Sequence, residues 1–142
     1  MKSKKQLYEF ISKQKVSFIS SIDEDGFPNT KAMFAPRKIN GNQFYFSTNT
    51  SSLRSQQYIN NPNACLYFYS KTRYRFEGLM LTGTMEVMQD EQTKEEIWLD
   101  GDTMYYKKGV TDPDYCVLRF TATKGRHYCN FKTDGFVFAD LT

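Results

Sequence analysis

The stretch VSFISSIDEDGFPNTKAMFAPRKINGNQFYFS, residues 16–47, gives the clearest indication of the fold class. Runs rich in apolar and β-branched residues alternate in it with short polar turns: strands at 16–22, 29–39 and 43–47, and turns at 23–28 and 40–42. The dipeptides Asp25-Gly26 and Asn40-Gly41 are strong signals for tight turns that need a positive φ angle. Strands joined by such short turns pair in antiparallel order, so we predict an antiparallel meander.

The rest of the chain adds strands and short helices to this meander. Apolar spacing and capping residues predict helices at 3–14, 52–60 and 90–101, with Ser3 and Asp90 as N-caps. Further strands are predicted at 64–69, 76–88 and 116–123, followed by a turn at Lys124-Gly125 and two last short strands. Glycines inside 76–88, at Gly78 and Gly83, suggest bends or bulges. Six to eight antiparallel strands with three helices favour a small barrel in a single domain, residues 1–142, because closure removes exposed edges.

The composition limits the classes of function. Hydrophobic residues make up 39% and charged residues 25% of the chain, as in a folded globular domain. Three widely spaced cysteines, with no CxxC motif, argue against a disulfide framework and for a reduced compartment. His127 is the only histidine, so one chain cannot build a His/Cys metal cluster. No signal-peptide pattern and no membrane-length apolar run is present, and we expect a cytoplasmic protein that binds no membrane.

The charge pattern argues against a nucleic-acid partner. The net charge is +3, from 19 basic and 16 acidic residues. The acidic residues are interleaved with the basic ones, whereas a nucleic-acid binder needs a continuous basic stripe. We therefore expect no nucleic acid among the partners.

The stretch FYFSTNTSSLRSQQ, residues 44–57, suggests an anion site. A strand runs into five short polar residues, Thr48 to Ser52, and then into a helix with Arg54 near its start. If Thr50 or Ser51 is the N-cap, the helix dipole disfavours Arg54 by roughly 0.3–1 kcal/mol. A phosphate would reverse this penalty by accepting hydrogen bonds from free backbone N–H groups, from Thr48 and Ser52 and from Arg54. The alternative is an ordinary cap followed by an exposed arginine.

A second cation supports the anion site. In a meander, the strand TKAMFAP (30–36) pairs with 43–48, which places Lys31 beside Thr48. Two cations and several hydroxyls then converge, unless Lys31 is simply an exposed strand residue. The chain contains no GxGxxG and no GxxxxGK[ST] motif, so neither a dinucleotide-binding fold nor a P-loop is indicated.

Four segments, in this order and spacing, resemble the pyridoxamine-phosphate oxidase-like, FMN-binding split-barrel family: FISSIDEDGFPNTKAMF, FYFSTNTSSLRSQQ, NNPNACLYFY and GLMLTGTMEV. The later stretch IWLDGDTMYYKKGVTDPDYCVLRFTA resembles the short general-stress-protein branch of that family. The resemblance covers roughly residues 5–138. It implies a mainly β fold, a six-stranded antiparallel split barrel with a few short peripheral helices. It also implies a homodimer that holds FMN at the subunit interface.

The resemblance also implies the cofactor-binding residues. A basic residue on the second strand, here Lys31, holds the flavin phosphate, and residues after it run past the flavin ring. A Thr-Asn-x-x-Ser-x-[Lys/Arg] element matches residues 48–54. The expected FMN-binding set is Lys31, Ala32, Met33, Phe34, Ser47, Thr48, Asn49, Ser52, Leu53, Arg54, Tyr69 and Trp98. Trp98 either packs its helix onto the barrel or the partner subunit, or walls the flavin site. Tyr105 and Tyr106 could cap a flat ligand, and no catalytic residue is assigned.

Two departures argue against vitamin B6 oxidation. Pro36 stands where the oxidase has a substrate-contacting lysine, although Arg37 follows it, and Arg126-His127 lacks the intervening residue of an Arg-x-His motif. We read Arg126-His127 as part of a turn. Two functions remain: an FMN-dependent oxidoreductase that uses a small-molecule substrate or a nicotinamide electron donor, and a non-catalytic, stress-related flavin store or sensor. The sequence leaves open whether another flavin-like cofactor or haem replaces FMN.

Overall fold

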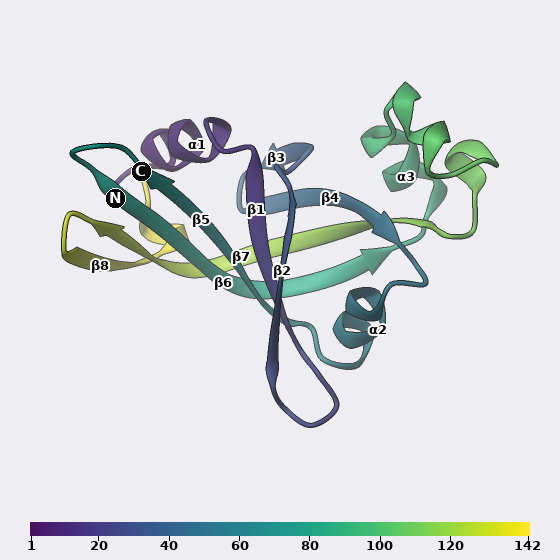
Figure 1. The fold of residues 1–142 in the computed structure, drawn as a ribbon, viewed down its shortest axis with the longest axis horizontal. Helices are drawn as coiled ribbons and strands as arrows, with labels where there is room; N and C mark the ends of the chain where they lie inside the picture. Colours follow the sequence, from purple (N-terminus) through teal and green to yellow (C-terminus); the bar gives the residue numbers. More distant parts are fainter.

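The computed structural model describes all of residues 1–142 and contains eight β-strands and three α-helices (Figure 1). Both chain ends lie at one end of the long strands, and α3 lies at the other. The elements are α1 (Lys4–Ser12), β1 (Val16–Ile22), β2 (Pro28–Phe34), β3 (Lys38–Asn40), β4 (Gln43–Asn49), α2 (Leu53–Asn60), β5 (Asn63–Lys71), β6 (Phe76–Met88), α3 (Glu91–Ile97), β7 (Tyr115–Cys129) and β8 (Lys132–Val137). Three 3₁₀ turns, at Asp100–Met104, Gly109–Thr111 and Phe138–Asp140, complete the chain.

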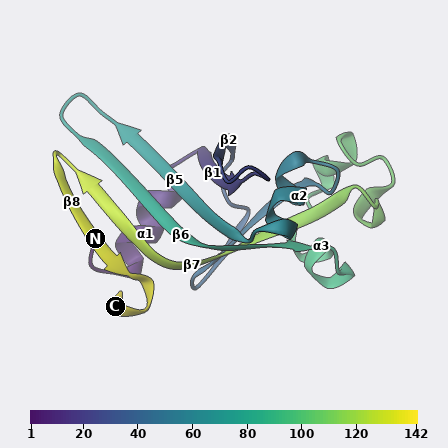
Figure 2. The same ribbon diagram turned by 90° about the horizontal axis from the view of Figure 1, so that it is seen from below.

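The strands form one antiparallel sheet in the order β2-β1-β5-β6-β7-β4-β3, and β8 pairs with β7 alone. Six strands have seven residues or more, whereas β3 has three residues and β8 pairs only with the second half of β7. The sheet is strongly twisted (Figure 2). A mainly β, antiparallel architecture with short helices is confirmed.

The inner face of the sheet carries the main hydrophobic core. Along β5, Leu66 and Phe68 are fully buried while Tyr67 and Tyr69 point outward, as the two-residue period of a strand requires. Helix α1 packs on this core through its apolar stripe: Leu7, Phe10 and Ile11. Each such buried side chain contributes about 1.5–3 kcal/mol, which anchors α1 against the sheet.

A second, smaller core holds α3 and the segment after it against β4 and β7. It consists of Tyr45, Ile97, Tyr106, Tyr115 and Val117. The Tyr115 hydroxyl donates to the backbone oxygen of Lys94 at 3.1 Å. This core fixes the segment between α3 and β7, which contributes one wall of the site described below.

The predicted strand 29–39 is wrong, since the chain forms two strands there, β2 and β3. Pro36 lacks the N–H that a sheet ladder needs and lies between them. After it, the Arg37 N–H donates to Tyr45 O at 2.8 Å, which attaches the chain to β4. Consequently β2 pairs with β1 only, and the predicted pairing of 30–36 with 43–48 is also wrong.

The C-terminal half contains two further corrections. Lys124-Gly125 is not a turn, because β7 continues to Cys129 and the chain reverses at Asn130-Phe131, where φ is 46° and 73°. Arg126 and His127 therefore lie in a strand. Helix α3 ends at Ile97, before the predicted Gly101, because the next residues extend and then form the 3₁₀ turn Asp100–Met104.

Candidate functional site

An open-sided cavity of about 390 Å³ lies between β2, β4, the start of α2 and the segment after α3. Eight of the twelve predicted cofactor-binding residues line it: Lys31, Ala32, Met33, Phe34, Ser47, Thr48, Asn49 and Arg54. The other lining residues are Val16, Arg37, Asp102, Tyr105 and Tyr106. Because β2 and β4 do not pair, the curvature of the sheet brings their residues together across this cavity.

Unpaired polar groups gather around Thr48. Arg54 is in the first turn of α2, as predicted, and its Nη2 donates to Thr48 Oγ1 at 3.1 Å. Arg54 Nε is buried and has no hydrogen-bond partner, and the same holds for Ser47 Oγ. Neither Arg54 nor Lys31 forms an ion pair. Since an unsatisfied buried polar group costs about 1–3 kcal/mol, this part of the cavity is suited to an anion.

The cavity also contains a strong ion pair, between Arg37 and Asp102. Arg37 Nη2 donates to Asp102 Oδ1 at 2.7 Å, and Nη1 donates to Asp102 Oδ2 and, at 3.3 Å, to Ile97 O. The two side chains are 25% and 5% exposed. The hydrogen bonds that Arg37 donates to Asp102 lower the pKa of the Asp102 carboxyl below its usual value, and they raise the pKa of Arg37. Both side chains are therefore ionised, and their opposite charges cancel.

Two tyrosines complete the wall on this side. The backbone N–H groups of Tyr105 and Tyr106 both donate to Asp102 O at 2.9 Å. Tyr106 is buried and stacks on Tyr115, with ring centroids 5.0 Å apart, and burial raises the pKa of its hydroxyl to about 12. The Tyr105 side chain, in contrast, is 68% exposed at the cavity. Asp102 thus orders both the cation and the aromatic wall.

The row of hydroxyls after β4 has mostly structural partners. Ser52 caps α2 by accepting from Ser55 N, so the prediction of Thr50 or Ser51 as the cap is wrong by one or two residues. The Thr50 hydroxyl donates to Pro113 O at 3.1 Å, and the Ser51 N–H donates to Asp114 Oδ1 at 2.9 Å. Only Thr48, among the five polar residues after Ser47, combines a buried hydroxyl with a place beside Arg54.

Four predicted residues lie outside the cavity lining. Ser52 is occupied as the cap of α2, and Leu53 faces solvent beside a different hollow. Tyr69 points from the outer face of β5. Trp98 packs against Tyr115, with ring centroids 5.0 Å apart, which confirms its packing role.

Sequence reasoning did not assign Val16, Arg37 and Asp102 to the site. The predicted helix 90–101 ends just before Asp102, and the partner of Asp102, Arg37, is 65 residues away in the chain. The sequence Asp100-Gly101-Asp102 could have indicated this, because Asp and Gly together favour a turn. Gly101 is then part of a turn and does not mark the end of a helix.

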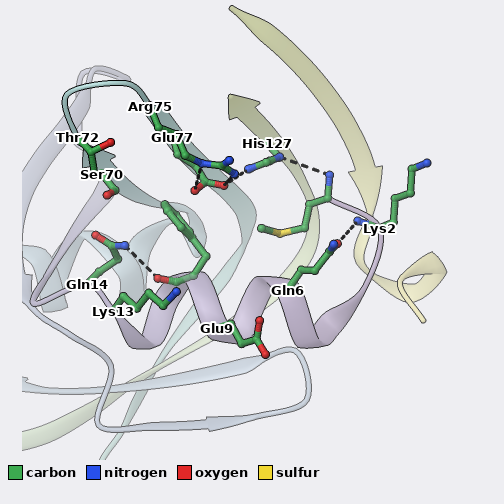
Figure 3. A pocket seen from close by; sticks show the side chains of 12 residues that line it. Lys2, Gln6, Glu9, Lys13, Gln14, Ser70, Thr72, Arg75, Glu77 and His127 are labelled. Atoms are coloured by element: carbon green, nitrogen blue, oxygen red, sulfur yellow. Dashed lines mark hydrogen bonds and ion pairs between the residues drawn. The ribbon is translucent and has the colours of Figure 1, made fainter. Parts of the chain in front are cut away.

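A larger cavity, of about 620 Å³, lies between α1 and the ends of β5, β6 and β7 (Figure 3). Its central groups are already paired: Glu77 Oε2 lies 2.7 Å from His127 Nε2 and 3.2 Å from Arg75 Nη2. Burial pulls the pKa of Glu77 upward, but hydrogen bonds from Arg75 and His127 outweigh it and lower the pKa. No unpaired buried cation is present there, so we regard the cavity near Arg54 as the functional site.

No group of three or more His, Cys, Asp or Glu side chains is placed to hold a metal ion. None of the helices has the length and apolar character needed to cross a membrane.

Comparisons with known proteins agree with the architecture of the fold. A structure of a protein related to general stress protein 26 of B. subtilis, from Clostridium acetobutylicum, is 37% identical, with 96% of this chain and 95% of that chain covered and a TM-score of 0.84. General stress protein 26 from Bacillus anthracis shares the fold at 15% identity, with 94% and 96% coverage and a TM-score of 0.73. A heme binding protein from Mycobacterium smegmatis shares it at 12% identity, with 92% and 56% coverage and a TM-score of 0.73.

A search of curated protein sequences found no match. The family model described as pyridoxamine 5'-phosphate oxidase matches residues 3–129, which is most of the chain. With this match and the split-barrel structure, the chain belongs to the pyridoxamine 5'-phosphate oxidase family.

Proposed function

We propose that the chain is an FMN-binding protein that acts as an FMN-dependent oxidoreductase on a small molecule. The observation that carries the proposal is the pair of unneutralised cations, Lys31 and Arg54, together with the buried and unpaired Nε of Arg54. Of the four charged residues in the cavity, Arg37 and Asp102 neutralise each other, so two positive charges remain. A phosphate monoester carries close to two negative charges at neutral pH, which matches this excess.

Each group of residues that lines the cavity matches one part of FMN. Arg54, Lys31 and Thr48 would hold the phosphate, and the buried Nε of Arg54 would gain a charge-assisted acceptor. The strand residues Ala32 to Phe34 and the tyrosines would lie along the ring. When bound, FMN supplies hydride and electron transfer, a chemistry that side chains do not provide.

The side chains that line the cavity also indicate what the protein itself would contribute to the reaction. No histidine or cysteine lines it, and the pKa values of Asp102 and Tyr106 are displaced away from neutrality. The chain would therefore bind, orient and shield the reactants rather than exchange protons near pH 7. The same observation supports a second candidate, a non-catalytic flavin store or sensor.

A titration tests the FMN proposal. FMN and riboflavin are added to wild type, Arg54→Ala and Arg54→Glu, and the Kd values are measured by flavin fluorescence. We expect Arg54→Ala to weaken FMN binding by roughly tenfold to a hundredfold, since charge-assisted hydrogen bonds are worth about 1.5–3 kcal/mol. Arg54→Glu should weaken it further by repulsion, whereas riboflavin binding should change little in either variant.

One outcome would contradict the proposed site, and another would distinguish the two candidate functions. If Arg54→Glu binds FMN as tightly as wild type, the phosphate lies elsewhere and the proposed site is wrong. If FMN binds as expected but neither NADH nor NADPH reduces it faster than free FMN, the store or sensor function is favoured over an oxidoreductase that uses these donors.

A further inference from the structure

The cavity has two electrostatically different parts. In one part, Arg54 contacts Thr48, and neither Arg54 nor Lys31, which also lines the cavity, has an acidic partner. Toward the segment after α3, the only cation is Arg37, and Asp102 neutralises it. An anionic group gains attraction in the first part and finds no free positive charge in the second.

We propose that the Arg37–Asp102 pair is a specificity device that disfavours phosphorylated substrates, so that the second ligand of the cavity is planar and carries no phosphate on or next to its ring. This inference rests on the proposed function for the identity of the first ligand. It concerns the part of the cavity that the cofactor phosphate would not occupy.

Arg37 cannot easily turn toward a phosphate. Both of its terminal nitrogens are engaged, Nη2 with Asp102 Oδ1 and Nη1 with Asp102 Oδ2 and Ile97 O. Its own backbone is attached to Tyr45 O. If Arg37 left, the carboxylate of Asp102 would keep only the hydrogen bond from Leu99 N at 3.0 Å, and it is 5% exposed. Breaking a buried pair by removing one partner is strongly destabilising, so Arg37 stays with Asp102.

The surroundings of the pair favour a flat ring. Tyr105 presents a mostly exposed ring at the cavity, and its backbone is held by Asp102 O. Phe34, on the β2 side, is 83% exposed. Aromatic rings that the chain leaves uncovered offer large apolar surfaces on which a flat ring can stack. Asp102 therefore holds the backbone of Tyr105 through its own backbone oxygen and removes the charge of Arg37 through its carboxylate.

Two probes that differ only in a phosphate test the inference: pyridoxine and pyridoxine 5'-phosphate. Both are titrated calorimetrically into FMN-loaded wild type, Asp102→Asn and the double variant Arg37→Gln/Asp102→Asn. We expect wild type to bind pyridoxine at least as tightly as its phosphate ester. Asp102→Asn frees the charge of Arg37 and should shift the ratio of the two Kd values about tenfold in favour of the ester. The double variant should return the ratio to that of wild type, because both charges are gone.

Glu86→Gln is the matched control. It removes the same charge from another arginine–carboxylate pair, with Arg119 at 3.0 Å, that does not line the cavity, and it should leave the ratio unchanged. A wild type that prefers the ester tenfold or more, or an Asp102→Asn variant with an unchanged ratio or no binding of the ester, would overturn the inference. If FMN itself fails to bind, the proposed function fails, and the same ratios measured without FMN still decide the role of the pair.

Discussion

At the scale of single residues, the Arg37–Asp102 pair should couple the stability of the fold to pH. The pKa of Asp102 is lowered in the folded protein, so its contribution is complete above the usual Asp value of about 3.9 and is lost as the pH falls through the folded value. We expect Asp102→Asn to lower the free energy of unfolding by about 1.5–3 kcal/mol near neutrality. Urea unfolding at several pH values should show this difference shrinking below about pH 4.

The neighbouring acid provides the control for this prediction. Asp100 is exposed, and its side chain makes no hydrogen bond, so Asp100→Asn should change the free energy of unfolding by no more than about 0.5 kcal/mol at each pH. A penalty for Asp102→Asn that stays constant down to pH 3 would contradict the assignment of a charged pair.

At the scale of elements, the pairing of β6 with β7 depends on Gly83. The register shifts between Thr82 and Gly83, which confirms the predicted bulge, and a Cβ on Gly83 would collide with the backbone oxygen of Thr121. A backbone atom in a paired strand cannot move aside cheaply. We expect Gly83→Ala to destabilise the protein by about 1–3 kcal/mol, the usual cost of overpacking, as measured by thermal or urea unfolding.

Gly78 in the same strand gives a matched comparison. A Cβ there would meet the hydroxyl end of the Tyr67 side chain, which is exposed and can rotate away. Gly78→Ala should therefore cost less than Gly83→Ala. Equal penalties would show that the bulge is not the sensitive feature of this strand pair.

At the scale of the whole molecule, we propose that the chain forms a homodimer that completes the open-sided cavity. Phe34 lines the cavity and is 83% exposed, and Val16, its cross-strand neighbour, is also exposed. Burying a Phe side chain contributes about 1.5–3 kcal/mol. Light scattering at micromolar concentration should give a dimer mass for wild type, and Phe34→Asp should shift the equilibrium toward monomer.

Phe131 is the control for the dimer prediction, because it is 85% exposed but lies at the β7–β8 turn, outside the cavity. Phe131→Asp should leave the mass unchanged. A monomer mass for wild type would refute the dimer, and equal effects of the two variants would place the interface elsewhere.

Local sequence patterns were sufficient to predict most of the elements and many of the residues that line the cavity. Strand 16–22 and strand 76–88 were predicted with their observed bounds, because apolar alternation and turn residues act within a few positions of the chain. Ser3 and Asp90 were correctly identified as N-caps, and Arg54 was correctly placed in the first turn of its helix. Residues 31–34 and 47–49 line one cavity, as the family motifs implied.

The way in which these elements pack together could not be predicted from such patterns. Lys31 and Arg54 share a cavity because the sheet curves, and not because β2 pairs with β4 as the sequence pattern suggested. Asp102 reaches Arg37 across 65 residues because the aromatic core around Tyr115 holds the segment after α3 against β4 and β7. Local patterns specify which face of an element is apolar. Which elements then share those faces depends on burying all of them at once, and this is a property of the whole chain.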